Sequence, residues 1–87
     1  MYLHLGQSVV VPFDEVIGVF DLDTASAVQV TRSFLSQAER EGRVVSISEE
    51  LPKSFVLRGA RKDRSTVYLS QLSSATLRGR AENNSFE

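Results

Sequence analysis

The 87 residues allow one domain, and a chain of this size buries only about 60–65% of its unfolded surface, so a partner subunit would stabilise it. Hydrophobic residues make up 41% of the chain and charged residues 24%, which is typical of a folded domain and not of a disordered one. The lack of cysteine excludes disulfides, a thiolate nucleophile and cysteine-based zinc sites. A single histidine, His4, excludes zinc sites built on histidine pairs.

Charge is distributed unevenly along a chain whose net charge is −1. Residues 1–52 contain three basic and eight acidic side chains, whereas residues 53–80 contain seven basic side chains and one acidic one. This asymmetry predicts a surface that attracts anions, although two solvated faces of opposite sign would give the same count. The N-terminus lacks a signal peptide, and no apolar run could span a bilayer. We therefore expect a cytoplasmic protein without membrane contact.

The first twenty residues predict three strands. Residues 2–5 and 8–11 read as short strands joined near Gly6, and Pro12 is expected to end the second one. Residues 16–20 are β-branched and aromatic, which favours a third strand, and Gly18 within it predicts a bulge or a close backbone approach.

A long helix is predicted for residues 27–41. Ser26 precedes Gln29 at the spacing of a capping box, and Val30, Phe34 and Ala38 recur every four residues, with Val28 and Leu35 widening the apolar stripe. Gly42 lies where a left-handed residue commonly ends a helix.

The second half predicts strands at 44–47, 55–57 and 67–69, with an exposed seven-residue polar loop at 59–65 between the last two. Ser73 or Ser74 can cap a short helix over about residues 75–81. We expect one α+β domain over residues 1–82, with a small, mostly antiparallel sheet against one long helix, and a frayed tail at 83–87.

Most candidate catalytic groups have a simpler structural interpretation. His4 alternates with Leu3 and Leu5 and has no identifiable nucleophile or orienting partner. Asp21 and Asp23 could hold a hard cation, but carboxylates before a helix more often cap its N–H groups. The adjacent pairs Asp14-Glu15 and Glu49-Glu50 are expected to be solvated turn charges. With no glycine-rich phosphate loop either, the sequence predicts a protein that is not an enzyme and uses no cofactor or metal.

The strongest physical signal is a set of basic residues near the predicted loop. Four of them fall within seven residues, where a hairpin tip could reach a nucleic-acid groove or follow its phosphates. A solubilising loop would have the same composition. The predicted DNA-binding residues are Lys53, Arg58, Arg61, Lys62 and Arg64.

Several segments resemble the bacterial extracellular matrix regulators of the RemA and RemB type, and the RemB branch more closely. The segments that carry the resemblance are residues 1–6, 9–12, 17–21, 42–45, 51–56, 67–70 and 73–77. The resemblance implies a cytoplasmic transcriptional regulator of matrix and biofilm genes without catalytic activity. The RemA branch resembles a β-rich DNA-binding module and assembles into rings, which array many weak contacts. We therefore expect a homo-oligomer, as a ring or a dimer, with double-stranded DNA as its partner.

One departure from the RemA pattern leaves two hypotheses open. RemA-like sequences carry arginines at positions that align with Glu15 and with Glu50 and Leu51 here, so those DNA contacts are not carried over. DNA contact could instead have moved to Lys53 and the basic loop. Alternatively, the chain could be a protein-interaction module of a regulatory assembly that does not itself contact DNA.

Overall fold

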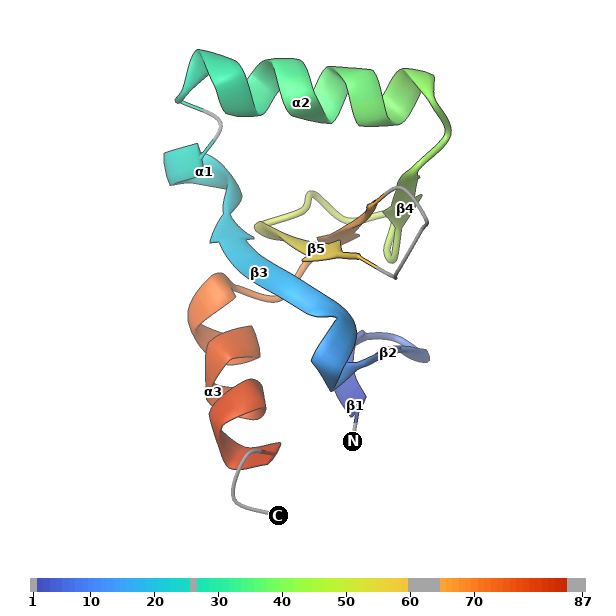
Figure 1. Ribbon diagram of the computed structural model, residues 1–87. Helices are drawn as coiled ribbons and strands as arrows, with labels where there is room; N and C mark the ends of the chain where they lie inside the picture. Colours follow the sequence, from blue (N-terminus) through green and yellow to red (C-terminus); the bar gives the residue numbers. More distant parts are fainter. Residues whose placement is uncertain (1, 26, 60–64, 85–87) are drawn as a thin grey trace.

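The computed structural model describes residues 2–25, 27–59 and 65–84, with side chains up to residue 81. It confirms an α+β fold in which a four-stranded sheet lies between a long helix on one side and a two-stranded sheet with a C-terminal helix on the other (Figure 1). The elements in chain order are β1 (Tyr2–Gly6), β2 (Val9–Pro12), a 3-10 turn η1 (Phe13–Glu15), β3 (Val16–Asp21), α1 (Leu22–Ala25), α2 (Gln29–Arg40), β4 (Val44–Ser46), β5 (Ser54–Arg58), β6 (Thr66–Ser70) and α3 (Ser74–Asn84).

The small sheet is the antiparallel hairpin β1–β2. Alternation along β1 buries Leu3 and Leu5 and exposes His4, as the sequence predicts. Its turn requires two left-handed residues, Gly6 at φ +115° and Gln7 at φ +52°. Pro12 is the last residue of β2, where its missing N–H costs no ladder bond.

The main sheet has the order β3-β5-β6-β4, antiparallel except for the parallel pair β4–β6. The bulge predicted at Gly18 is confirmed, because the β3–β5 register shifts between Val16 and Gly18. A Cβ atom at Gly18 would lie 2.7 Å from the Phe20 ring, so the aromatic side chain folds back over a position without a side chain. Phe20 in turn stacks on Phe55 at a centroid distance of 4.9 Å.

Two hydrophobic clusters cover the two faces of the main sheet. Adjacent β5 residues separate them, since Val56 belongs to one cluster and Phe55 to the other. The cluster towards the small sheet and α3 contains Leu3, Leu5, Val11, Val56, Tyr68 and Leu77. The cluster towards α2 contains Ala38, Phe55 and Val67, with Phe34, Leu35 and other partly buried residues around them.

The predicted helix over 27–41 begins later than expected. Asp21 instead starts the separate turn α1, where its Oδ1 accepts hydrogen bonds from the N–H groups of Asp23 (2.9 Å) and Thr24 (3.3 Å). Val28 is the N-cap of α2 and supplies no side-chain bond. The predicted capping box is therefore wrong: Gln29 is the first residue of α2 and not its third, while Ser26 lies outside the described residues.

The apolar stripe of α2 is only partly buried. Ala38 is fully buried and Phe34 packs on the sheet, but Val30 is 78% exposed and Val28 is 53% exposed. The helix packs on β4 and β6, so its first turn is not covered. The expectation that Val30 faces the core is wrong for this reason.

α3 begins where the serines predict. The Ser73 Oγ accepts a hydrogen bond from the Thr76 N–H at 3.1 Å, and Leu77 one turn on is fully buried. The helix extends to Asn84, beyond the predicted end near residue 81, and thus includes the first two residues of the expected tail. Residues 85–87 lie outside the described part.

Two glycine-to-alanine changes test the backbone requirements directly. Gly42 follows α2 at φ +73°, and Gly79 lies inside α3; a Cβ atom would meet nothing within 4 Å at either position. We expect Gly42→Ala to lower the free energy of unfolding by about 1 kcal/mol through left-handed backbone strain. Gly79→Ala should raise it by about 0.5–1 kcal/mol through helix propensity. Urea denaturation of both variants gives the comparison, and equal effects would contradict it.

Candidate nucleic-acid interface at the base of the β5–β6 connection

The structure places two of the five predicted DNA-binding residues. Lys53 is exposed immediately before β5, and Arg58 is the last residue of β5. Five residues of extended chain separate them by about 16 Å, so they occupy opposite ends of the strand. Arg61, Lys62 and Arg64 lie outside the described residues. Arg58 pairs with Thr66 across the β5–β6 ladder, so the chain leaves and re-enters the sheet at the same end.

Glu15 holds the end of β5. The Arg58 Nε donates to Glu15 Oε1 at 2.7 Å, and the Gly59 N–H donates to the Glu15 backbone carbonyl at 2.9 Å. A further Arg58 nitrogen, Nη1, donates to the Tyr68 hydroxyl at 3.0 Å. The side chains of Arg58 and Glu15 remain 31% and 33% exposed. One residue from η1 therefore fixes both the backbone and the guanidinium at the start of residues 58–64, which we call the basic segment.

These contacts correct the sequence interpretation of Glu15. The sequence predicts a solvated turn charge, but Glu15 forms a long-range ion pair with a residue 43 positions later. The hydrogen bonds from Arg58 to Tyr68 and to Glu15 raise the pKa of the Arg58 guanidinium, because both favour its charged form. Arg58 therefore stays cationic, while an adjacent carboxylate neutralises its charge locally.

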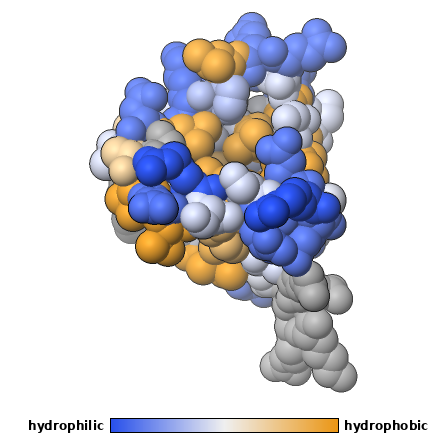
Figure 2. All heavy atoms as spheres, turned by 90° about the horizontal axis from the view of Figure 1, so that it is seen from above, coloured by the Kyte–Doolittle hydropathy of each residue, from blue (hydrophilic) through white to orange (hydrophobic). Residues whose placement is uncertain are grey.

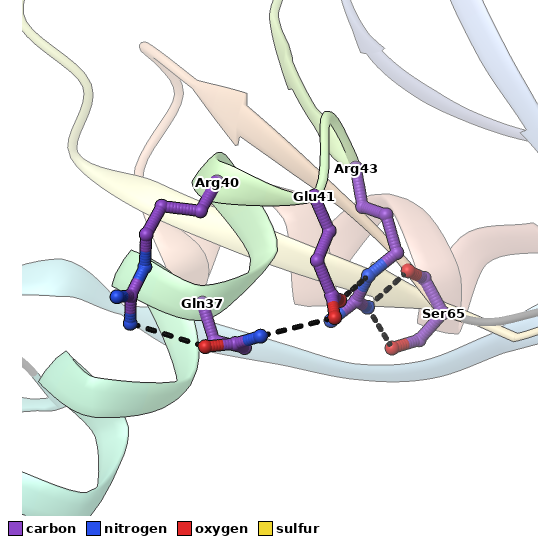
Figure 3. Close-up of polar contacts among 5 residues, drawn as sticks. All are labelled: Gln37, Arg40, Glu41, Arg43 and Ser65. Atoms are coloured by element: carbon purple, nitrogen blue, oxygen red, sulfur yellow. Dashed lines mark hydrogen bonds and ion pairs between the residues drawn. The ribbon is translucent and has the colours of Figure 1, made fainter.

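Arg43 holds the other end of the connection (Figure 3). Its Nη1 donates to the Ser65 carbonyl at 2.6 Å and to the Ser65 Oγ at 3.0 Å, just before β6. Glu41 pairs with Arg43 at 2.8 Å and also accepts a hydrogen bond from Gln37 at 3.0 Å. The Arg43 guanidinium lies 5.8 Å from the Phe34 ring centroid. The chain after α2 is thus tied to the start of β6.

Sequence reasoning missed Arg43, Glu15 and Tyr68 as supports of the basic segment. Arg43 and Ser65 are 22 positions apart, and Glu15 and Arg58 are 43 apart. No local spacing rule connects such pairs. The opposite charges of Glu15 and Arg58 are visible in the sequence, but only the β3–β5 register, which aligns Val16 with Arg58, brings them together.

The remaining candidate residues have structural roles or carry no site geometry. His4 points away from the buried face of β1, and Asp21 caps α1. Within the described residues, no three His, Asp or Glu side chains gather in a way that could hold a metal ion. None of the helices in the described part of the chain is long and apolar enough to cross a membrane.

Two substitutions test the Arg58 contacts. Tyr68→Phe removes the acceptor of a charged hydrogen bond and should lower the free energy of unfolding by about 1 kcal/mol. Glu15→Gln should cost about 0.5 kcal/mol, and this cost should shrink at high salt because the pair is partly exposed. Glu50→Gln, in an exposed turn, is the matched control, and it should destabilise the fold less than Glu15→Gln and show no loss that shrinks at high salt. Urea denaturation at low and high salt measures all three, and an equal destabilisation in Glu50→Gln would contradict the assignment.

Comparison with known proteins shows the family to which the chain belongs. No family model matches it. It is 34% identical over 82 residues to extracellular matrix regulatory protein B of Bacillus subtilis (strain 168), and the match covers 94% of this chain and 91% of that protein. The resemblance drawn from the sequence segments is thereby confirmed. The chain belongs to the family of extracellular matrix regulatory protein B.

Proposed function

We propose that this protein is a non-enzymatic, cytoplasmic regulator of extracellular matrix genes that works as a homo-oligomer and contacts double-stranded DNA. The observation that carries the regulatory role is the match to extracellular matrix regulatory protein B over nearly the whole of both chains. The excess of seven basic residues over one acidic residue in positions 53–80 supports an anionic partner.

The geometry around the basic segment favours it as the contact. Glu15 holds Arg58 and Gly59 at one end, and Arg43 holds Ser65 at the other. A segment whose two ends are fixed loses less conformational entropy on binding than one attached to mobile strands. The DNA contacts proposed for Arg61, Lys62 and Arg64 therefore fall between two fixed ends of the chain, with Lys53 at the far end of β5 as a further contact.

Several exposed apolar side chains support assembly into a dimer or a ring. Figure 2, which looks onto the α2 side, shows hydrophobic side chains reaching the surface among hydrophilic ones. An open apolar hollow lies between α2 and the β3–β5 edge, lined by Phe20, Ala25, Val30, Thr31, Phe34, Phe55 and Leu57. Ile17 on the outer strand β3 is 61% exposed. Covering such an edge and such a hollow is what a second subunit provides.

The second candidate is a protein-interaction module that regulates matrix genes without touching DNA. The Glu15–Arg58 pair favours it, since a carboxylate already neutralises one of the predicted DNA-binding charges. The exposed apolar hollow at α2 fits a protein partner equally well. The two candidates differ in whether the salt dependence of DNA binding follows the basic segment.

DNA affinity measured against salt concentration tests the leading proposal. We expect the double substitution Arg61→Ala and Lys62→Ala to weaken binding to all duplexes alike. The slope of log affinity against log salt should become shallower by about 0.9 for each phosphate that the variant no longer binds. The double substitution Arg32→Ala and Arg78→Ala, at two exposed arginines outside the basic segment, removes the same charge and should leave the slope unchanged. Unchanged binding by the double variant would place the DNA surface elsewhere, and absent wild-type binding would favour the interaction module.

The Glu15–Arg58 pair gives an opposite expectation for the same assay. Glu15→Gln removes the charge that neutralises Arg58, so DNA affinity should rise and the salt slope should steepen by about 0.9 if Arg58 then meets a phosphate. Glu39→Gln on α2 changes the net charge equally but is not next to any predicted DNA-binding residue in the sequence, and it should produce a smaller effect. Equal gains in both variants would show a general charge effect.

Light scattering tests the assembly. The chain has a mass of 9.6 kDa, and we expect a particle of at least twice that mass at micromolar concentrations, because a domain of this size leaves its edges and apolar hollow uncovered. A monomer across the whole concentration range would refute the homo-oligomer.

A further inference from the structure

The outer edge of β3 is open and apolar. β3 stands at one end of the strand order of the main sheet, and within the described residues only β5 pairs with it. From Val16 to Phe20 the strand carries no charged side chain, although charges and short length are usual devices against edge pairing. The opposite edge has both devices, because β4 has only three residues and Glu49 and Glu50 follow it closely. Of the two edges, β3 is therefore the one open to pairing.

Ile17 projects from this edge as an exposed apolar side chain. It lies in the β3 bulge, since the register with β5 shifts between Val16 and Gly18. Its Cδ1 lies over Gly59, where an added Cβ atom would come within 2.5 Å of it. Leu57 packs towards α2, so alternation along the chain places Gly59, and Ile17 with it, on the α2 side of the sheet. Ile17 is 61% exposed there.

The apolar hollow beside α2 lies towards the other end of the same edge. It has a volume of about 300 Å³, which leaves room for the four-carbon side chain of an isoleucine. Phe20 near the end of β3 and Val30 in the first turn of α2 both line it, and Thr31 is its only polar lining residue. Figure 1 shows α1 and the start of α2 beyond the end of β3. An exposed apolar side chain and an apolar hollow thus occupy opposite ends of one strand.

A two-fold axis would bring these two features together twice. In an antiparallel pair of β3 strands with the axis between Gly18 and Val19, Ile17 lies opposite Phe20 of the partner subunit. The partner's Ile17 then lies opposite Phe20 of the first copy. Both pairs fall on the α2 side, so each isoleucine reaches the hollow of the other copy. Pairing of β3 with the β4 edge of a second copy would leave the hollow without such a side chain.

The exposed apolar area is close to what a stable dimer requires. Ile17 (61%), Phe20 (38%), Val28 (53%) and Val30 (78%) are exposed along β3 and at the start of α2. Together they present roughly 300–400 Å² of apolar surface, taking about 100–200 Å² for each side chain. A standard interface buries about 800 Å² on each partner, and about 60% of that area is apolar. The four side chains therefore supply most of the apolar part, and the outer β3 backbone adds polar groups that pair.

We propose that two copies of this chain associate by antiparallel pairing of their β3 strands, with Ile17 of each copy seated in the apolar hollow of the other. The inference rests on the homo-oligomer of the proposed function and specifies its contact and its symmetry. The contact joins two four-stranded sheets into one continuous sheet. Because it uses the same surface on both copies, any larger assembly built from this pair has an even number of subunits.

Two substitutions test the contact through the dissociation constant of the dimer, measured by sedimentation over a range of concentrations. Ile17→Lys places a charge on the seated side chain, and Val30→Asp places one on the wall of the hollow. Each change occurs twice in a two-fold interface, so a tenfold loss at each site raises the dissociation constant about a hundredfold. An acidic residue in the first turn of a helix favours that helix, so Val30→Asp should remain folded. Leu51→Lys, at an 87% exposed apolar residue near β4, is the matched control and should leave the constant unchanged.

Introduced cysteines test the register, because the chain has none of its own. Residues directly opposite in an antiparallel pair have Cα atoms about 4.5–5.5 Å apart, within the range that a disulfide spans. A mixture of Ile17→Cys and Phe20→Cys proteins should therefore form a linked dimer under mild oxidation. Either variant alone should link much more slowly, because its two cysteines then lie about 10 Å apart along the strands. A mixture of Ile17→Cys and Val45→Cys tests the alternative contact between β3 and β4.

Four results would overturn the proposal. Unchanged association in both Ile17→Lys and Val30→Asp would place the contact elsewhere and leave the homo-oligomer standing. Equal weakening in Leu51→Lys would show a general effect of charge. Faster linkage in the mixture with Val45→Cys, or an odd number of subunits in native mass spectrometry, would show a head-to-tail contact. A wild type that stays monomeric at every concentration would refute the homo-oligomer itself, and the apolar edge would then belong to a contact with a different protein.

Discussion

The Ser70 hydroxyl lies where the small sheet, the main sheet and the start of α3 meet. It donates to Leu5 of β1 and accepts from Leu72, while its cross-strand partner Ser54 donates to the Leu72 carbonyl. These contacts satisfy three backbone groups at a junction where no ladder can reach them. They also fix the direction in which the chain leaves β6, and hence how α3 brings Leu77 against Leu3 and Leu5. The packing of the β1–β2 hairpin and α3 on the main sheet therefore depends on these two serine side chains.

The two faces of the main sheet are covered to different extents. One face is closed by α3 and the hairpin over the cluster around Val56. The other is only partly closed, since α2 covers β4 and β6 but leaves Phe20 and Val30 beside an open apolar hollow. Between the faces, Glu15 and Arg43 hold the ends of the β5–β6 connection from opposite sides of the sheet order. The apolar hollow beside α2 and the base of the β5–β6 connection therefore lie in separate regions of the sheet.

Local signals predicted much of this fold. Alternation located β1, β-branched runs located β3, β5 and β6, Gly18 located the bulge and Gly42 the end of α2. These features depend on a few neighbouring residues. The failures have a different physical origin. Spacing alone could not tell that the sheet ends short of Val30, nor that Asp21 would start a separate turn before α2.

The candidate site was predicted less completely than the fold. Composition identified the basic residues, because charge is visible without a structure. Their supports were not predictable, since Glu15 reaches Arg58 only through the β3–β5 register and Arg43 reaches Ser65 only after β4 has paired with β6.

Anchoring both ends of the β5–β6 connection has a consequence for how this chain can diverge. The ladder fixes Arg58 opposite Thr66, so the intervening segment only has to close on itself. Doubling the length of such a closed segment costs about 0.6 kcal/mol of chain entropy, a small part of a domain's stability. A change in the length of this segment therefore costs the fold little, as long as the contacts of Glu15 and Arg43 at its two ends are kept.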